Sequence, residues 1–145
     1  MQFDGRIEAP VSCQSFYSFV TDPKSVLSVI PDVIDSRIVD DDHFSVRARV
    51  GAGPIKGIID MDFEVLDMKR PKFARLRGLG RGMQSSIDLS LSMSIEKTKT
   101  GCEARWNAEV NVGGMLAGVG GRMLAGITER YVRQMTDQLS RKVAE

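Results

Sequence analysis

Hydrophobic and polar residues alternate with a period of two along much of this 145-residue chain. In residues 2–9, uncharged residues are interleaved with Asp4, Arg6 and Glu8. This alternation is typical of a half-buried strand, because successive side chains point to opposite faces of a sheet. Pro10 ends the strand, and two short helices are expected between Ser12, a suitable N-cap, and Pro31.

From Val33 the alternation continues through six further strands of an antiparallel meander. Turns are expected at residues 40–42, 51–54, 70–72, 78–82 and 99–101. One parity is uncharged, as in Ile59, Met61, Phe63 and Val65. The other parity forms a basic, an acidic and a second basic row, which are Arg47 and Arg49, then Asp60, Asp62 and Glu64, then Arg75 and Arg77. Neighbouring strands would therefore pair opposite charges on the solvent face.

After Val112 the apolar period becomes that of a helix, which is predicted over Met115–Ala144. Such a helix would be about 45 Å long, and its apolar stripe would be covered by the uncharged face of the sheet. The predicted fold class is therefore α+β. It is a helix-grip fold in which a curved seven-stranded antiparallel sheet wraps around a long C-terminal helix, with two short helices after the first strand. Residues 1–145 form a single domain in this interpretation.

Composition narrows the function classes. The formal charge is +1 and aromatic residues make up 6% of the chain, so neither a basic patch nor a base-stacking platform for nucleic acid is indicated. No stretch approaches the roughly 18 consecutive apolar residues of a membrane span, and the N-terminal residues do not resemble a leader. A cytoplasmic protein is expected. Cys13 and Cys102 lie far apart and are interpreted as small buried hydrophobic residues.

The charged residues indicate neither a catalytic nor a metal site. Asp60, Asp62 and Glu64 belong to the solvent parity, whereas general acid–base catalysis requires a shielded carboxyl group. The only histidine, His43, follows three aspartates in an expected exposed turn. The glycine-rich segments 51–57 and 78–82 do not match a phosphate-binding loop, and no cofactor is predicted.

The start of the predicted helix is unusually rich in glycine. Six glycines fall within fourteen residues, and each would cost about 0.5–1 kcal/mol in a helix interior. They are Gly113, Gly114, Gly118, Gly120, Gly121 and Gly126. One interpretation is close packing against the sheet or another chain. The other is that missing side chains leave room for a ligand and that this segment opens as a gate.

The inner face and the helix together predict an apolar ligand cavity. Its expected lining consists of uncharged side chains from the central strands and the helix. The residues are Phe44, Met61, Phe63, Leu76, Leu89, Leu91, Trp106, Met115, Leu116, Val119, Met123 and Ile127, with Gly113, Gly114 and Gly118 as the gate. Methionine suits a pocket that adapts to its contents.

Seven short motifs are shared, in order, with a known family. They are Met1-x-Phe3-x-Gly5, Ala9-Pro10, Thr21-Asp22-Pro23, Ile30-Pro31, Gly53-Pro54-Ile55-Lys56-Gly57, Leu76-Arg77-Gly78-x-Gly80 and Val112-Gly113-Gly114-x-Leu116-Ala117. In these features the chain resembles the carbon monoxide dehydrogenase G-subunit family of the START-like superfamily. The resemblance implies a non-catalytic accessory protein that assists a carbon monoxide dehydrogenase-type molybdenum hydroxylase. It also implies peripheral contact with the inner face of the membrane, or delivery of a quinone.

Three functions remain open from the sequence. The first is a binding module for a lipid or quinone, which requires a cavity of at least about 300 Å³. The second is a cyclase- or hydrolase-like enzyme of the same superfamily, which requires an inward acid or base with a shifted pKa. The third is an adaptor that docks a larger oxidoreductase and has a filled interior.

Overall fold

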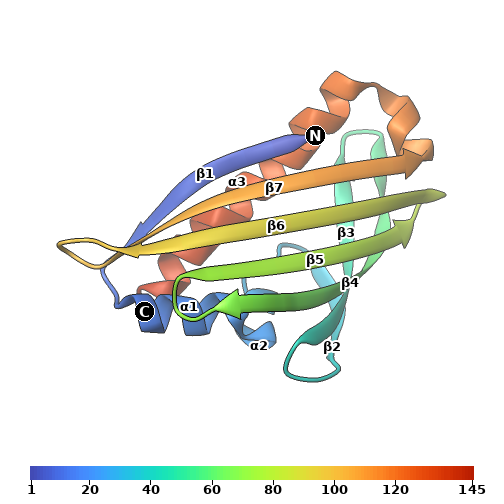
Figure 1. Ribbon diagram of the computed structural model, residues 1–145. Helices are drawn as coiled ribbons and strands as arrows, with labels where there is room; N and C mark the ends of the chain where they lie inside the picture. The colour runs from blue at the N-terminus through green and yellow to red at the C-terminus, as the bar shows by residue number, and fades with distance from the viewer.

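One antiparallel sheet contains every strand of the computed structural model, which describes residues 1–145 apart from the side chains of Ala52, Asp67 and Met68. The strands are β1 (Gln2–Ala9), β2 (Val33–Ile38), β3 (His43–Ala52), β4 (Ile55–Lys69), β5 (Phe73–Gly82), β6 (Ser85–Lys97) and β7 (Cys102–Gly114). Their order across the sheet is β1-β7-β6-β5-β4-β3-β2, so β1 and β2 are the two edges (Figure 1).

Two short helices connect β1 to β2, as predicted. Helix α1 (Cys13–Thr21) begins where the Ser15 amide donates to Ser12 Oγ at 3.1 Å. Helix α2 (Pro23–Leu27) starts directly after Asp22, whose carboxylate accepts from the Lys24 amide at 3.4 Å. Capping side chains satisfy amides that have no partner within the helix. The expected N-cap at Ser12 is confirmed.

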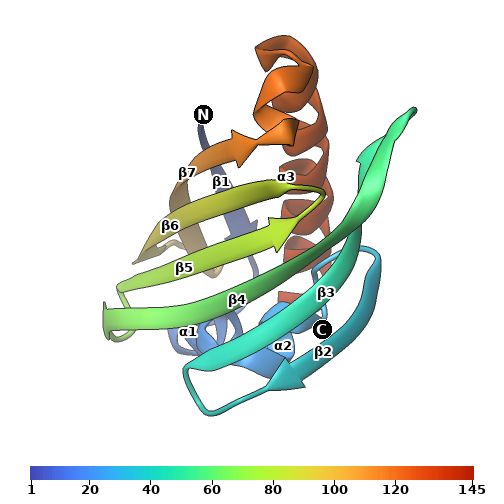
Figure 2. The same cartoon turned by 90° about the vertical axis from the view of Figure 1, so that its right-hand side faces the viewer.

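The long helix α3 (Gly121–Val143) lies along one face of the curved sheet (Figure 2). It packs against β1 and α1 and follows a short 3-10 helix, η1 (Met115–Val119). The predicted seven-stranded helix-grip fold is therefore confirmed.

The charge rows predicted for the outer face are present. Arg47 Nε lies 2.8 Å from Asp60 Oδ1 across β3 and β4, and Arg77 lies 3.4 Å from Asp88 across β5 and β6. Both pairs are well exposed. The ladder thus reinforces the strand register while leaving the opposite face uncharged.

The turn predicted at residues 78–82 is wrong, because these residues form the end of β5. The hairpin turn lies at Met83 and Gln84, which have φ angles of 54° and 55°. Gly78 stands opposite Phe63 in the register, and a Cβ on Gly78 would lie 2.8 Å from the Phe63 ring. Glycine in this strand therefore makes space for a large cross-strand side chain rather than ending the strand.

The predicted helix start at Met115 is also wrong. Gly113 and Gly114 end β7, and Gly120, with φ 105°, separates η1 from α3. The sequence pattern predicts one continuous helix because the apolar side chains of η1 have spacings that also occur in an α-helix. Of the six glycines, Gly126 is therefore the one in the interior of an α-helix. Most of the helix destabilisation expected from the glycines does not arise.

Apolar side chains form two separate core clusters. The larger one joins β1, β6, β7, α1 and the end of α3, and includes Phe16, Ala104, Trp106 and Val143. The smaller one lies under β3, β4 and α2, and includes Phe44, Val46 and Val65. The two clusters flank the middle of the inner face.

Candidate functional site

The central part of the inner face is only partly buried. Five of the predicted lining side chains on β4, β5 and β6 are of intermediate exposure, namely Met61, Phe63, Leu76, Leu89 and Leu91. Fully packed core positions in the same sheet, such as Ile59 and Ala104, are at most 1% exposed. Leu89 and Leu91 pack on the border of the larger cluster, and Phe63 and Leu76 pack on the border of the smaller one. These side chains therefore keep part of their apolar surface exposed where the two clusters end.

Two predicted lining residues belong instead to the packed clusters. Phe44 is 1% exposed and stacks on Phe63 with ring centroids 4.9 Å apart. Trp106 is 7% exposed and lies over Gly5, where a Cβ would be 2.7 Å from the indole ring. The two rings belong to β3 and β7, which lie toward opposite edges of the sheet.

The residues contributed by η1 and α3 differ widely in burial. Leu116 is buried, whereas Val119 and Ile127 are partly exposed. Met115 and Met123 are 52% and 47% exposed, which is high for large apolar side chains. The second half of α3 packs on the larger cluster through Val132, Leu139 and Val143, but no residue of its first turns belongs to either cluster among the described side chains. The start of α3 is therefore the least anchored part of the inner surface.

Hydrogen bonds that involve side chains tie η1 and α3 to β3, β6 and the end of α2. The Leu116 amide donates to Ser85 Oγ at 2.8 Å. Tyr131 donates its hydroxyl proton to the backbone oxygen of Arg49 at 3.1 Å, and Lys142 donates to the backbone oxygen of Ser28 at 2.7 Å. The sequence contains no signal for these contacts, because they join segments that lie far apart in the chain.

The three predicted gate glycines occupy different environments. Gly113 and Gly114 lie in the last two pairs of the β6–β7 ladder, opposite Ser86 and Ser85 respectively. Gly118, in η1, has no atom within 4 Å of the position that a Cβ would occupy. The structure therefore brings the glycines to one end of the inner face but leaves only Gly118 in open space.

The predicted lining carries no charged side chain, whereas Tyr131 on α3 is a titratable group whose pKa is raised chiefly by burial. Among the described residues no polar or charged side chain is buried. His43 is exposed, and its Nδ1 lies 2.8 Å from Asp40 Oδ1, a hydrogen bond that raises the pKa of His43. Within the described part of the chain, no three histidine, cysteine or acidic side chains group as metal ligands.

The two cysteines meet, although 88 residues separate them in the chain. The predicted burial is confirmed for Cys102, which is 1% exposed, but it is wrong for Cys13, which is partly exposed at the start of α1. Burial, together with a hydrogen bond and the charge of Cys13, raises the pKa of the Cys102 thiol to about 12. Sequence spacing could not show this, because the contact depends on how α1 turns back onto β7.

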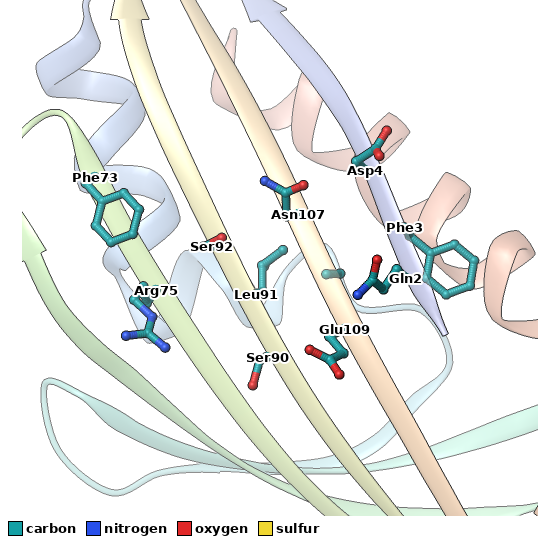
Figure 3. A pocket seen from close by; sticks show the side chains of 11 residues that line it. Gln2, Phe3, Asp4, Phe73, Arg75, Ser90, Leu91, Ser92, Asn107 and Glu109 are labelled. Atoms are coloured by element: carbon teal, nitrogen blue, oxygen red, sulfur yellow. The ribbon is translucent and has the colours of Figure 1, made fainter.

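A separate hollow of about 470 Å³ lies on the outer face of the sheet. Polar side chains of β1, β7, β6 and β5 line much of it, with Phe73 at one end (Figure 3). They include Asp4, Arg75, Ser90 and Glu109. The hollow is open and charged, so it differs from the apolar surface that the sequence predicts.

No helix formed by the described residues is both long and apolar enough to cross a bilayer.

Solved structures share this architecture over almost its full length. A conserved protein from Geobacillus kaustophilus is 21% identical, with a TM-score of 0.87 over 99% of this chain and 95% of that chain. A START superfamily protein from Mycobacterium smegmatis is 11% identical, with a TM-score of 0.73 over 98% of this chain and 96% of that one. Identities this low establish the fold alone, which is START-like.

No curated protein matches the sequence. A sequence profile for the G-subunit of carbon monoxide dehydrogenase (CoxG) matches residues 5–144, which is nearly the whole domain. That range includes six complete motifs of the resemblance and both halves of the inner face. The chain therefore belongs to the carbon monoxide dehydrogenase CoxG family.

Proposed function

We propose that this protein is a non-catalytic accessory protein that binds a hydrophobic small molecule, a lipid or a quinone, between the inner face of its sheet and α3. The main support for this proposal is that Met61, Leu76, Leu89 and Leu91, which lie between the two packed clusters, are only partly buried. Apolar surface left accessible inside a fold gains free energy when a ligand covers it, at about 25 cal/mol per Å².

The chemistry of this surface favours an apolar ligand over an ionic one. The predicted lining is entirely uncharged, and it contains three methionines, Met61, Met115 and Met123. Flexible thioether side chains can adapt to chains of different shape. An alkyl or isoprenoid tail would gain about 0.8 kcal/mol for each methylene group buried. The ligand's polar head would lie toward solvent, because the lining offers it no charged partner.

Ligand entry is proposed at the end of the sheet where β7 passes into η1. Met115 and Met123 are exposed there, and Gly118 has free space around it. The first turns of α3 lack the cluster contacts that anchor its second half. Opening of this segment, with Gly113, Gly114 and Gly118 as the gate, would expose the inner face and break only the last two pairs of the β6–β7 ladder.

Family membership supports the proposed partner. The matching family is named for a component of carbon monoxide dehydrogenase. We place the protein in the cytoplasm beside a molybdenum hydroxylase of that type, at the inner face of the membrane. An enzyme of the cyclase or hydrolase type would instead need a shielded acid or base, and the buried side chains described in the structure are apolar.

Native mass spectrometry of the purified protein, followed by organic extraction, tests the proposal. We expect a co-purifying lipid or quinone, or uptake of added decylubiquinone with quenching of the single tryptophan, Trp106. Ile127→Trp should fill the space and abolish uptake, whereas Glu129→Trp, on an exposed position of the same helix, should not. Mass spectrometry rather than fluorescence is the readout for these two variants. An empty protein that takes up neither lipid nor quinone would leave the docking adaptor as the better explanation.

The partner is tested separately with a purified hydroxylase of the carbon monoxide dehydrogenase type. We expect the protein to bind it in biolayer interferometry and to bring it down with vesicles of anionic phospholipid. Ligand uptake without either effect would retain the carrier and refute the partnership.

A further inference from the structure

The edge strand β2 carries an unusually exposed apolar segment. All six of its residues are exposed, and four of the eight large apolar side chains exposed among the described residues fall in residues 33–39. These are Val33, Ile34, Ile38 and Val39, at 37%, 42%, 47% and 55% exposure. Edge strands present unpaired backbone groups to any strand that can match them.

The sequence of this edge is self-complementary in the antiparallel sense. Around Ser36 it reads Val33-Ile34-Asp35-Ser36-Arg37-Ile38-Val39. A second copy turned about a two-fold axis through Ser36 places Asp35 opposite Arg37, and it does so twice. The register of β2 is irregular between Val33 and Asp35, so the regular part of the new ladder is centred on Asp35, Ser36 and Arg37. We propose that a second copy of this chain pairs with β2 along this edge and forms a symmetric dimer with a continuous sheet.

The backbone geometry fits this axis. The Val39 amide donates to the His43 oxygen at 2.9 Å, so Val39, Arg37 and Asp35 turn their backbone groups toward β3. Ser36 and Ile38 therefore turn theirs toward the free edge. Two Ser36 residues facing each other would exchange both hydrogen bonds. Asp35 and Arg37 would then occupy non-hydrogen-bonded pairs, in which side chains approach most closely.

Charge selects this register over its neighbours. A two-fold axis through Asp35 would place that carboxylate opposite itself, and an axis through Arg37 would do the same with two guanidinium groups. Within the described structure Arg37 has no ion-pair partner in its own chain. The Ser36 amide donates a hydrogen bond to Asp35 Oδ1 at 2.9 Å. This bond satisfies an amide of the free edge, and a backbone oxygen of the second copy would take its place in the dimer. Arg37 is thus available to a second copy, where it would meet an Asp35 that already stands opposite Arg47 of its own chain.

The opposite edge is the natural comparison. Strand β1 also carries an aspartate and an arginine around a central residue, Asp4 and Arg6 about Gly5. There Arg6 lies 3.8 Å from Glu103 of β7, and α3 packs against the strand. Its inward side chain Ile7 is 3% exposed, in contrast to Ile38. The second copy is therefore assigned to β2, and Asp4 provides the control.

Sedimentation velocity over a range of protein concentrations tests the dimer. We expect the wild type to show a concentration-dependent monomer–dimer equilibrium. Asp35→Arg alone and Arg37→Asp alone should each weaken it by about tenfold or more, because attraction becomes repulsion at two symmetric positions. An equimolar mixture of these two variants should dimerise again, as should the double variant D35R/R37D. Asp4→Arg should behave like the wild type.

Recovery in the mixture excludes misfolding of the single variants as the cause of their loss. A wild type that stays monomeric at its highest soluble concentration would overturn the proposal. So would dimers that persist in Asp35→Arg, fail to return in the mixture, or are lost in Asp4→Arg. Neither variant touches the inner face, so ligand uptake is expected to be unchanged, and the two proposals can fail independently.

Discussion

Replacing Gly114 by alanine should destabilise the protein strongly, although the residue lies at the end of a strand. Gly114 has φ 82°, a conformation that costs a non-glycine residue about 1–3 kcal/mol. A Cβ there would overlap the backbone oxygen of Gln84 and lie 2.9 Å from the Cα of Ser85. Both neighbours are backbone atoms of the facing strand and turn, so no side chain can rotate out of the way.

The expected loss is therefore at least about 2 kcal/mol, the cost of the dihedral angle together with the overlap. For a domain of this size such a loss lowers Tm by about 4–8 °C. The change also strains the neighbouring contacts, in which the Met115 amide donates to the Gln84 oxygen at 3.0 Å and the Leu116 amide donates to Ser85 Oγ. These contacts fix the path from β7 into η1.

Gly118→Ala is the matched control, because this glycine has an ordinary φ and free space around its Cα. Alanine there should leave stability within about 1 kcal/mol of the wild type, in the stabilising direction. Thermal and urea denaturation followed by far-ultraviolet circular dichroism measure both variants. If Gly114→Ala melts within about 2 °C of Gly118→Ala, the positive φ and the close approach to Gln84 are wrong.

Three further results are expected. In Asp40→Asn the pKa of His43, followed by proton NMR, should fall toward its ordinary value, because the Asp40 hydrogen bond is the main cause of its rise. The raised pKa also means that the His43–Asp40 pair stabilises the fold at pH values below the ordinary histidine pKa. This contribution is lost as the pH rises through the pKa of the folded protein. An unchanged titration would contradict the contact. With iodoacetamide at pH 8, Cys13 should be alkylated while Cys102 reacts only after unfolding, since burial holds its pKa at about 12; peptide mass spectrometry distinguishes the two, and equal rates would refute the burial of Cys102. Phe44→Ala should cost about 3–5 kcal/mol in urea denaturation, because the ring is 1% exposed and stacked on Phe63, and a loss below about 1 kcal/mol would show that the smaller cluster is not a packed core.

The regular part of the fold could be predicted because its signal is local. Alternation placed Phe44, Met61 and Trp106 on one face, and the register confirms their common side. The charge rows likewise followed from parity, as the Arg47–Asp60 pair shows. Each of these inferences needs only the period of two and the order of the strands.

The errors arose where one residue type serves two purposes. Gly78 and Gly80 indicate a turn in the sequence, but in the structure they accommodate Phe63 and Met61 from the next strand. Gly120 interrupts a helical pattern that the apolar residues on either side continue. The deciding feature is a cross-strand contact at Gly78 and Gly80 but a φ of 105° at Gly120, and glycine content alone cannot distinguish a turn from a close approach.

Other features depend on position in the sheet. The self-complementary segment around Ser36 is visible in the sequence, but it becomes meaningful only because β2 is an edge strand. The meeting of Cys13 with Cys102 and the bond from Tyr131 to Arg49 also depend on tertiary packing. The lining residues remain a prediction, although the structure places most of them on a common, partly exposed surface.

The proposed dimer and the proposed ligand surface have a joint geometric consequence. A two-fold axis perpendicular to the sheet at β2 keeps each face of the sheet on its own side. The two inner faces, each with its α3, would therefore lie on the same side of the combined sheet. The same axis reverses every direction within the sheet, so the proposed entries near Gly118 would lie at opposite ends of the combined sheet. If both proposals hold, each copy takes up its ligand through its own entry, so D35R should weaken the dimer while leaving the uptake of a free quinone per chain unchanged.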